Sequence, residues 1–160
     1  MTRVRCFAIA ALLLLTTAIP ARADLTGFLG VNLTPANRQT VGAAFGAGLL
    51  IIGFEGEYAA TAQDVPSGSP SLQTGMGSLL LQTPGAFFGF QPYFATGGGI
   101  YHEVLGAHSD TGIGLNTGGG VKISLIGPIR LRVDYRLLKL GNGALYPTAH
   151  RIYAGLNLKL

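Results

Sequence analysis

The stretch IRLRVDYRL, residues 129–137, decides the fold class because its apolar and charged residues alternate without a break. The apolar set is Ile129, Leu131, Val133, Tyr135 and Leu137, and the charged set is Arg130, Arg132, Asp134 and Arg136. Successive side chains of a β-strand point to opposite faces, so a period of two indicates a strand whose two faces meet different surroundings. The stretch therefore predicts a strand with one apolar and one charged face.

The same alternation recurs along the chain, and no stretch shows the three-to-four-residue apolar spacing of an amphipathic helix. Near residue 55, the acids Glu55 and Glu57 alternate with Phe54 and Tyr58. Breaks at Gly, Pro, Asn and Asp clusters divide the sequence into eight predicted strands. These strands are 25–34, 39–48, 50–60, 72–83, 88–103, 111–124, 129–140 and 149–160.

The connections between the predicted strands differ in length on the two sides of the sheet. The longer ones are 35–38, 61–71, 104–110 and 141–149, and the tight ones lie near Gly48, at 84–86 and at 127–128. Short turns on one side and longer loops on the other are typical of outer-membrane barrels. We therefore predict an all-β, eight-stranded, antiparallel up-and-down transmembrane barrel with short periplasmic turns and longer extracellular loops. An even strand number places both termini in the periplasm.

Composition indicates which face of the sheet points outward. Charged residues make up only 11% of the sequence, too few to cover a soluble exterior, and glycine contributes 25 of 160 residues. A polar, small-residue face suits a crowded lumen, so we expect the apolar face to meet lipid. Two alternatives remain: a soluble lipocalin-like barrel with its apolar face inside, and a helical span over 39–54, which contains a GxxxG match.

Residues 1–23 have the features of a cleaved secretion signal. Arg3 and Arg5 precede an apolar run that is too short to span a membrane, and Ala21-Arg22-Ala23 matches a small-x-small cleavage pattern. Cleavage after Ala23 leaves 24–160 as the barrel domain. It removes three arginines and Cys6, the only cysteine, and lowers the formal net charge from +4 to +1. A protein with this charge is not expected to bind nucleic acid.

The sequence resembles the outer-membrane protein β-barrel domain family, the small eight-stranded bacterial barrels. The similar pieces are GFEGEY at 53–58, QPYFATGGG at 91–99, GLNTGGGVK at 114–122 and IRLRVDYR at 129–136. The resemblance covers essentially all of 24–160 and implies an outer-membrane location without a cofactor. Two departures are the terminal Leu160, where the family usually has an aromatic residue, and the absence of tryptophan.

We expect the charged face to fill the lumen with a structural charge network. Ten residues are candidates for it: Glu55, Glu57, Glu103, Lys122, Arg130, Arg132, Asp134, Arg136, Arg151 and Lys159. Buried charges need partners, and an eight-stranded barrel is just filled by its side chains, so the network would plug it. Across the barrel, the seventh strand would bring Arg132 to Glu55 of the third. A small channel is the alternative to this plug.

Catalytic and metal sites are not expected, and the protein is predicted not to be an enzyme. His108-Ser109-Asp110 offers triad residue types, but consecutive strand residues point to opposite faces. Glu55 and Glu57 fit lumen charge balance better than glycoside chemistry, and sequence-local metal ligands are absent. The predicted partners are outer-membrane lipids, lipopolysaccharide and the barrel-insertion machinery, for a monomer with no cofactor. A lipid-modifying enzyme of the outer leaflet remains the alternative.

Overall fold

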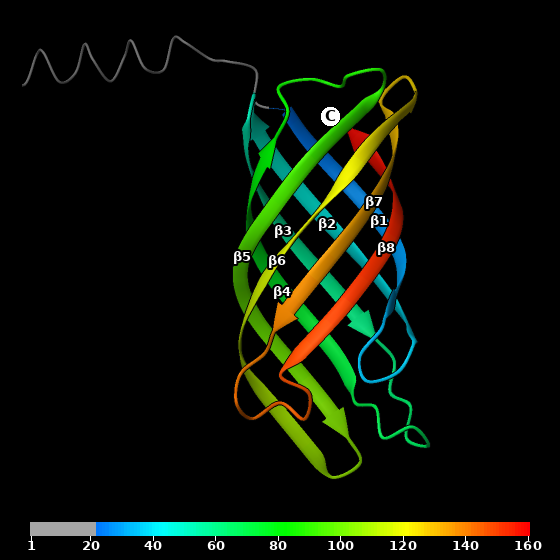
Figure 1. Ribbon diagram of the computed structural model, residues 1–160, viewed down its shortest axis with the longest axis vertical. Helices are drawn as coiled ribbons and strands as arrows, with labels where there is room; N and C mark the ends of the chain where they lie inside the picture. Colours follow the sequence, from blue (N-terminus) through cyan, green and yellow to red (C-terminus); the bar gives the residue numbers. More distant parts are fainter. Residues whose placement is uncertain (1–21) are drawn as a thin grey trace, which may run out of the picture.

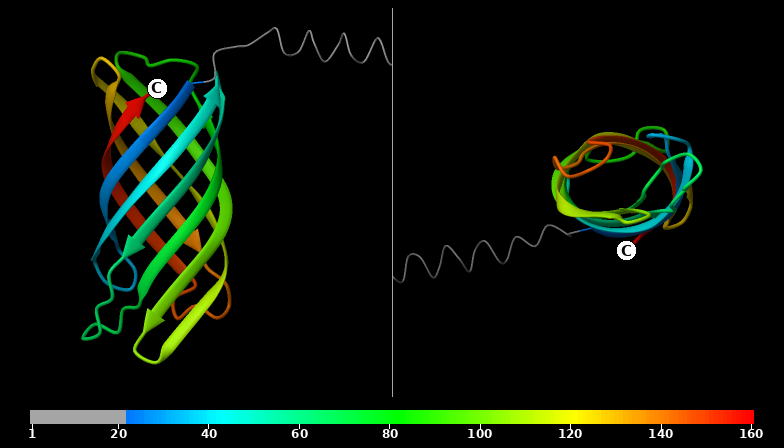
Figure 2. Two further views of the ribbon diagram at one scale, coloured as in Figure 1. Left: turned by 180° about the vertical axis from the view of Figure 1, so that it is seen from behind. Right: turned by 90° about the horizontal axis from the view of Figure 1, so that it is seen from below.

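The computed structural model describes residues 22–160, which form one closed antiparallel barrel (Figure 1). Each strand pairs with the next along the chain, and β1 pairs with β8 to close the ring, which is oval in cross-section (Figure 2). The strands are β1 (Arg22–Asn32), β2 (Arg38–Leu49), β3 (Ile52–Thr61), β4 (Ser71–Gln82), β5 (Phe90–Leu105), β6 (His108–Ile126), β7 (Ile129–Lys139) and β8 (Thr148–Lys159). The predicted eight-stranded barrel is confirmed.

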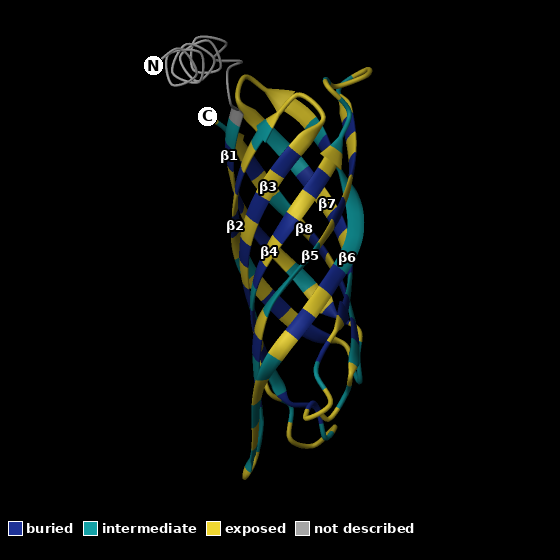
Figure 3. Ribbon diagram, turned by 90° about the vertical axis from the view of Figure 1, so that its left-hand side faces the viewer, coloured by how far each residue is buried: buried dark blue, intermediate teal, exposed yellow. Residues whose placement is uncertain are grey.

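Buried and exposed residues alternate along the strands in a checkerboard (Figure 3). On β7, Arg132, Asp134 and Arg136 are at most 1% exposed, whereas Tyr135 is 42% exposed. The apolar residues thus form the outside and the charged residues the inside, the reverse of a soluble barrel. The helical alternative for 39–54 is wrong, because these residues form β2 and the start of β3. No helix among residues 22–160 is long and apolar enough to cross a membrane.

Two connections differ from the sequence prediction. The predicted loop 104–110 is instead a tight turn at Gly106-Ala107, because β5 and β6 continue as one long hairpin with Gly106 at a φ of 60°. Conversely, the expected tight turn at 84–86 is a loop that covers 83–89 between β4 and β5. Pro84 lacks the amide that a tight hairpin would use, and Phe88 and Gly89 both adopt positive φ.

Small residues were expected to leave room for other side chains in the lumen, but glycines of β5 are required by the approach of two backbones instead. A Cβ atom built on Gly97 or Gly99 would lie 2.0 Å from a backbone carbonyl oxygen of β4. These positions therefore need glycine because the backbones of β4 and β5 approach closely, which is typical of sites where a barrel wall bends.

The predicted signal segment falls almost entirely on residues 1–21, which lie outside the described residues. Its last two residues, Arg22 and Ala23, are the first two of β1. The barrel domain predicted over 24–160 corresponds to the remainder of the described chain.

Candidate functional site in the barrel lumen

The centre of the lumen holds two arginines and two carboxylates from opposite walls. Arg132 Nη2 lies 3.0 Å from Glu55 Oε1 and 3.0 Å from Asp134 Oδ2, and Arg132 Nη1 also contacts Glu55. Arg136 donates from Nη2 to Glu55 Oε1 at 2.9 Å and from Nε to Asp134 Oδ1 at 2.8 Å. All four side chains are 0% exposed. This central layer, defined as Glu55, Arg132, Asp134 and Arg136, is electrically neutral.

Tyr93 from β5 completes the central layer. Its hydroxyl accepts a hydrogen bond from Arg132 Nε at 2.6 Å and donates one to Asp134. The guanidinium carbon of Arg132 also lies 4.8 Å from the centre of the Tyr93 ring. Burying a charge is costly unless its hydrogen-bonding groups are satisfied. Here hydrogen bonds and a cation–π contact together hold the Arg132 guanidinium in place.

A second ion pair lies beside the central layer and also crosses between strands. Arg151 of β8 contacts Glu57 of β3, and Tyr153 donates to the other Glu57 oxygen at 3.1 Å. The Tyr153 ring stacks on Phe28 of β1 with centroids 4.0 Å apart. The aromatic pair and the ion pair thus fill the space between β1, β3 and β8.

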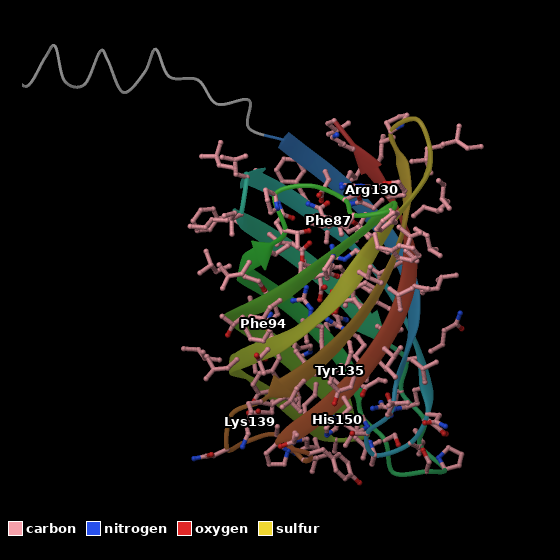
Figure 4. All side chains as sticks on the ribbon, turned by 45° about the horizontal axis from the view of Figure 1, so that its top comes forward. Phe87, Phe94, Arg130, Tyr135, Lys139 and His150 are labelled. Atoms are coloured by element: carbon pink, nitrogen blue, oxygen red, sulfur yellow. The ribbon has the colours of Figure 1, made fainter. Side chains whose placement is uncertain are left out.

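The end of the lumen that carries the termini is less balanced. Asp24 of β1 accepts from Lys122 Nζ at 2.6 Å and from Arg130 Nη2 at 3.2 Å. Asp24 Oδ1 is buried without a hydrogen-bond partner in the described chain. A cavity of about 30 Å³ lies here, lined by these residues and Lys159. We call Asp24, Lys122 and Arg130 the mouth cluster; Figure 4 labels Arg130 near this end.

The opposite end of the lumen is closed by the loop between β7 and β8. Leu140 and Ala144 of this loop are buried against Tyr101 and Leu138 in an apolar cluster. The loop amide of Leu145 donates to Glu103 Oε1 at 2.6 Å, and the same carboxylate oxygen lies 3.3 Å from His108 Nε2. The loop therefore forms an apolar cap over the charged interior.

The structure places eight of the ten predicted network residues in three ion-paired groups and leaves two outside them. Glu55, Arg132, Asp134 and Arg136 meet in the central layer, Glu57 meets Arg151, and Lys122 and Arg130 meet at Asp24. Glu103 lies apart under the cap, and Lys159 lines the mouth cavity.

Sequence reasoning missed Asp24, Tyr93 and Tyr153 as members of these groups. Asp24 directly follows the predicted cleavage site, and the candidate set contained charged residues only, so it left out both tyrosines. The sequence offers one signal for them: each residue is an even number of positions from other lumen-facing residues of its strand, so its side chain points to the same face.

The histidines are divided between the two faces of the barrel. On the outer face, His102 Nδ1 lies 2.7 Å from Thr111 Oγ1, and His150 Nδ1 lies 2.6 Å from the Tyr135 hydroxyl (Figure 4). His108 and Asp110 instead bond to Glu103 and Tyr101, so His108, Ser109 and Asp110 are not assembled as a triad. Within residues 22–160, no three His, Cys, Asp or Glu side chains gather as metal ligands.

No family model and no curated protein sequence matches the chain, but solved structures do. Neisserial surface protein A superposes with a TM-score of 0.67 at 18% identity, covering 88% of this chain and 96% of that chain. Ail, the attachment invasion locus protein of Yersinia pestis, was solved with a heparin analogue and matches with a TM-score of 0.57 at 11% identity over 88% and 99%. The outer membrane enzyme PagL matches with a TM-score of 0.55 at 11% identity over 84% and 98%. The fold is therefore that of the small eight-stranded outer-membrane barrels.

Proposed function

We propose that the chain is a non-enzymatic integral protein of the bacterial outer membrane, with a structural or surface-interaction role and a lumen plugged by charged side chains. The observation that carries this proposal is the central layer, whose four ionic groups are unexposed and mutually paired. The ion pairs occupy the middle of the lumen and the loop over the other end adds an apolar cap, an arrangement that supports a plug over a water-filled pore. The protein then acts through its outer surface and loops rather than as a pore.

The outer-membrane location is supported by the outward apolar face and by the fold of the structural neighbours. The partners under this proposal are outer-membrane lipids and lipopolysaccharide, together with the insertion machinery during assembly, and the barrel works as a monomer. Export depends on the predicted signal over residues 1–23. A surface ligand of the kind recorded for Ail would contact the loops 33–37, 62–70 and 140–147 or the tip of the β5–β6 hairpin at 106–107.

Conductance across a planar bilayer tests the plug. The purified barrel is expected to show little or no steady current, whereas a stable open channel would contradict the proposal.

Topology is tested with epitope tags: a tag within 62–70 should be reachable on intact cells, and a tag after Leu160 should not. The reverse pattern would overturn the orientation.

A second candidate, a lipid-modifying enzyme of the outer leaflet, is favoured by one observation. His102 and Thr111 form a hydrogen-bonded pair of a base and a hydroxyl on the lipid-facing surface, near the end where the cap lies. The mass profile of lipid A decides between the two functions. The non-enzymatic proposal expects identical profiles with the wild type, with His102→Gln and without the protein. A change that requires both the protein and His102 would favour the enzyme.

A further inference from the structure

Large apolar side chains project from the turns at the end that carries the termini. Exposed fractions are 59% for Leu50, 53% for Ile51, 65% for Phe87, 101% for Phe88 and 81% for Ile126. We call these five residues the apolar rim. The three connections at this end, 50–51, 83–89 and 127–128, contain no charged residue. Turns that lie in water are ordinarily rich in polar residues, so this composition needs a separate cause.

Two residues of the rim have backbone conformations that large apolar residues rarely adopt. Leu50 and Phe88 have φ values of 50° and 51°, and they are the only non-glycine residues with positive φ among residues 22–160. Gly, Asn and Asp adopt this left-handed conformation at lower cost than a large apolar residue. In water, asparagine would relieve the strain and solvate the turn. An apolar environment outside the chain would instead favour Leu and Phe at both positions.

The height of the barrel's apolar surface identifies that environment. On β8, outward apolar residues run from Ile152 to Leu160, and beyond Ile152 the next residue of this register is His150. At about 3.3 Å per residue and a strand tilt of about 40°, this run covers only about 20 Å along the barrel axis. The apolar band of an outer-membrane barrel is about 25 Å tall. On β3 the run from Ile52 to Tyr58 is shorter still, whereas on β6 the outward run from Ile113 to Leu125 covers the full height, so the apolar surface is short on some strands only.

The rim is continuous with the lipid-facing wall. Leu49 pairs with Ile52, and Ile52 pairs with Leu81, so an apolar row leads across β2, β3 and β4 directly beside the turn at Leu50 and Ile51. In Figure 4, Phe87 lies at the same end of the barrel as Arg130. The rim therefore extends the apolar band beside β3 and β8, where the strands alone are too short.

We propose that the apolar rim inserts among the acyl chains of the periplasmic leaflet, so that the turns at this end are a lipid-binding surface rather than loops in the periplasm. The proposal rests on the outer-membrane location. Its occupant is the lipid bilayer itself, because the rim lacks charge, continues the lipid-facing wall and adds apolar height beside the strands on which the apolar run is short.

Fluorescence quenching in vesicles tests where the rim lies. Single cysteines at Phe88, Phe94 and Ser67, in a Cys6→Ser background, carry an environment-sensitive dye; Phe94 is on the barrel wall and Ser67 is in the loop at the other end. Lipids with brominated acyl chains should quench the dye at positions 88 and 94, and aqueous iodide should quench the dye at 67. Folding of each variant is checked by heat-modifiable migration on a gel.

Each failure has a distinct meaning. A dye at position 94 that brominated lipid does not quench would contradict the membrane location itself. If position 94 responds to lipid while position 88 responds to iodide as position 67 does, only the rim proposal fails. A dye at 88 that neither quencher reaches would show another protein surface, such as a second copy of the chain, covering the rim, and would also overturn the proposal.

Substitution of Phe88 with asparagine should change the stability of the barrel in opposite directions for a turn in lipid and for a turn in water. Phe88→Asn relieves the left-handed backbone but removes the apolar side chain. For a turn in lipid, the ratio of folded to unfolded protein in vesicles should fall about tenfold, as expected for loss of one buried phenylalanine. For a turn in water, the ratio should stay constant or rise. Val65→Asn, at an exposed loop position on the other end, is the matched control and should leave the ratio unchanged.

Discussion

The central layer and the mouth cluster are built from the same residue types but differ in charge balance and in access to water. In the central layer, two guanidiniums face two carboxylates, all 0% exposed. In the mouth cluster, Lys122 and Arg130 share the single carboxylate of Asp24, which is 13% exposed and borders a small cavity. The fully buried centre is neutral, whereas the mouth cluster, with two cations and one acid, borders a cavity that water can enter.

This difference predicts that the two regions contribute unequally to stability. A buried ionic group that loses its partner keeps its full desolvation cost, whereas one at the mouth can be rehydrated. The central layer also joins β3 to β7 across the lumen, so its loss affects two opposite walls. The mouth cluster joins β1 to β6 and β7 near the strand ends.

The largest effect is expected from Glu55→Gln. The substitution removes the carboxylate that both Arg132 and Arg136 contact, and leaves two buried guanidiniums with one acid. We expect a loss of about 3–5 kcal/mol in the free energy of unfolding, the range for breaking a buried pair. Urea unfolding in vesicles, followed by gel mobility, measures it. An unchanged midpoint would show that water already solvates the centre, and the contrast with the mouth would disappear.

An arginine introduced on the lipid-facing surface has no acidic partner, and it can be compared with an arginine that is paired inside the lumen. Leu156 is 62% exposed on the lipid-facing side of β8, whereas Arg151 of the same strand is buried with Glu57. Leu156→Arg should cost about 2–4 kcal/mol in vesicles, because a charge on the lipid face is unsolvated near the midplane. Leu156→Met is the control of similar size. Normal insertion of Leu156→Arg would mean that this face does not meet lipid.

The double variant Glu55→Gln/Arg132→Gln measures how strongly the central layer is coupled. Removing one charge of each sign restores neutrality, so the double variant should lose less than the sum of the two single losses. We expect a coupling of about 1–3 kcal/mol, as for residues in one hydrogen-bonded network. The equivalent cycle with Glu57→Gln and Arg132→Gln should be closer to additive, because Glu57 contacts Arg151 instead.

The sequence predicted the barrel well because strand alternation is a local property. Residues 129–137 alone establish which of their side chains share a face, and eight such segments establish the closed topology. Strand order around a barrel also places β3 opposite β7, so Glu55 and Arg132 could be matched in advance. The relative height of two side chains depends on the stagger between strands, which no local pattern records.

Stagger and loop conformation account for what the sequence did not reveal. Asp24 reaches Lys122 because β1 and β6, which are not neighbours, place them at the same height in the lumen. Glu103 pairs with a loop amide rather than with one of the lumen arginines, since the chain after β7 folds inward at Leu140 and Ala144. Tyr93 belongs to the central layer through its hydroxyl, which a candidate set of charged residues alone does not include.

The smallest effect is expected from Asp24→Asn in the mouth cluster. The substitution removes the carboxylate that Lys122 and Arg130 both contact, but both border a cavity through which water can enter, and Arg130 keeps its hydrogen bonds to Asn157 at 2.7 Å and Gln91 at 3.0 Å. We expect a loss of about 1 kcal/mol, below the range for a fully buried pair, because water in the cavity can rehydrate the two cations. Added salt should reduce the difference between wild type and Asp24→Asn, because ions screen accessible charges, and should leave the Glu55→Gln difference nearly unchanged. Equal losses and equal salt dependence for the two variants would contradict the distinction between a sealed centre and a hydrated mouth.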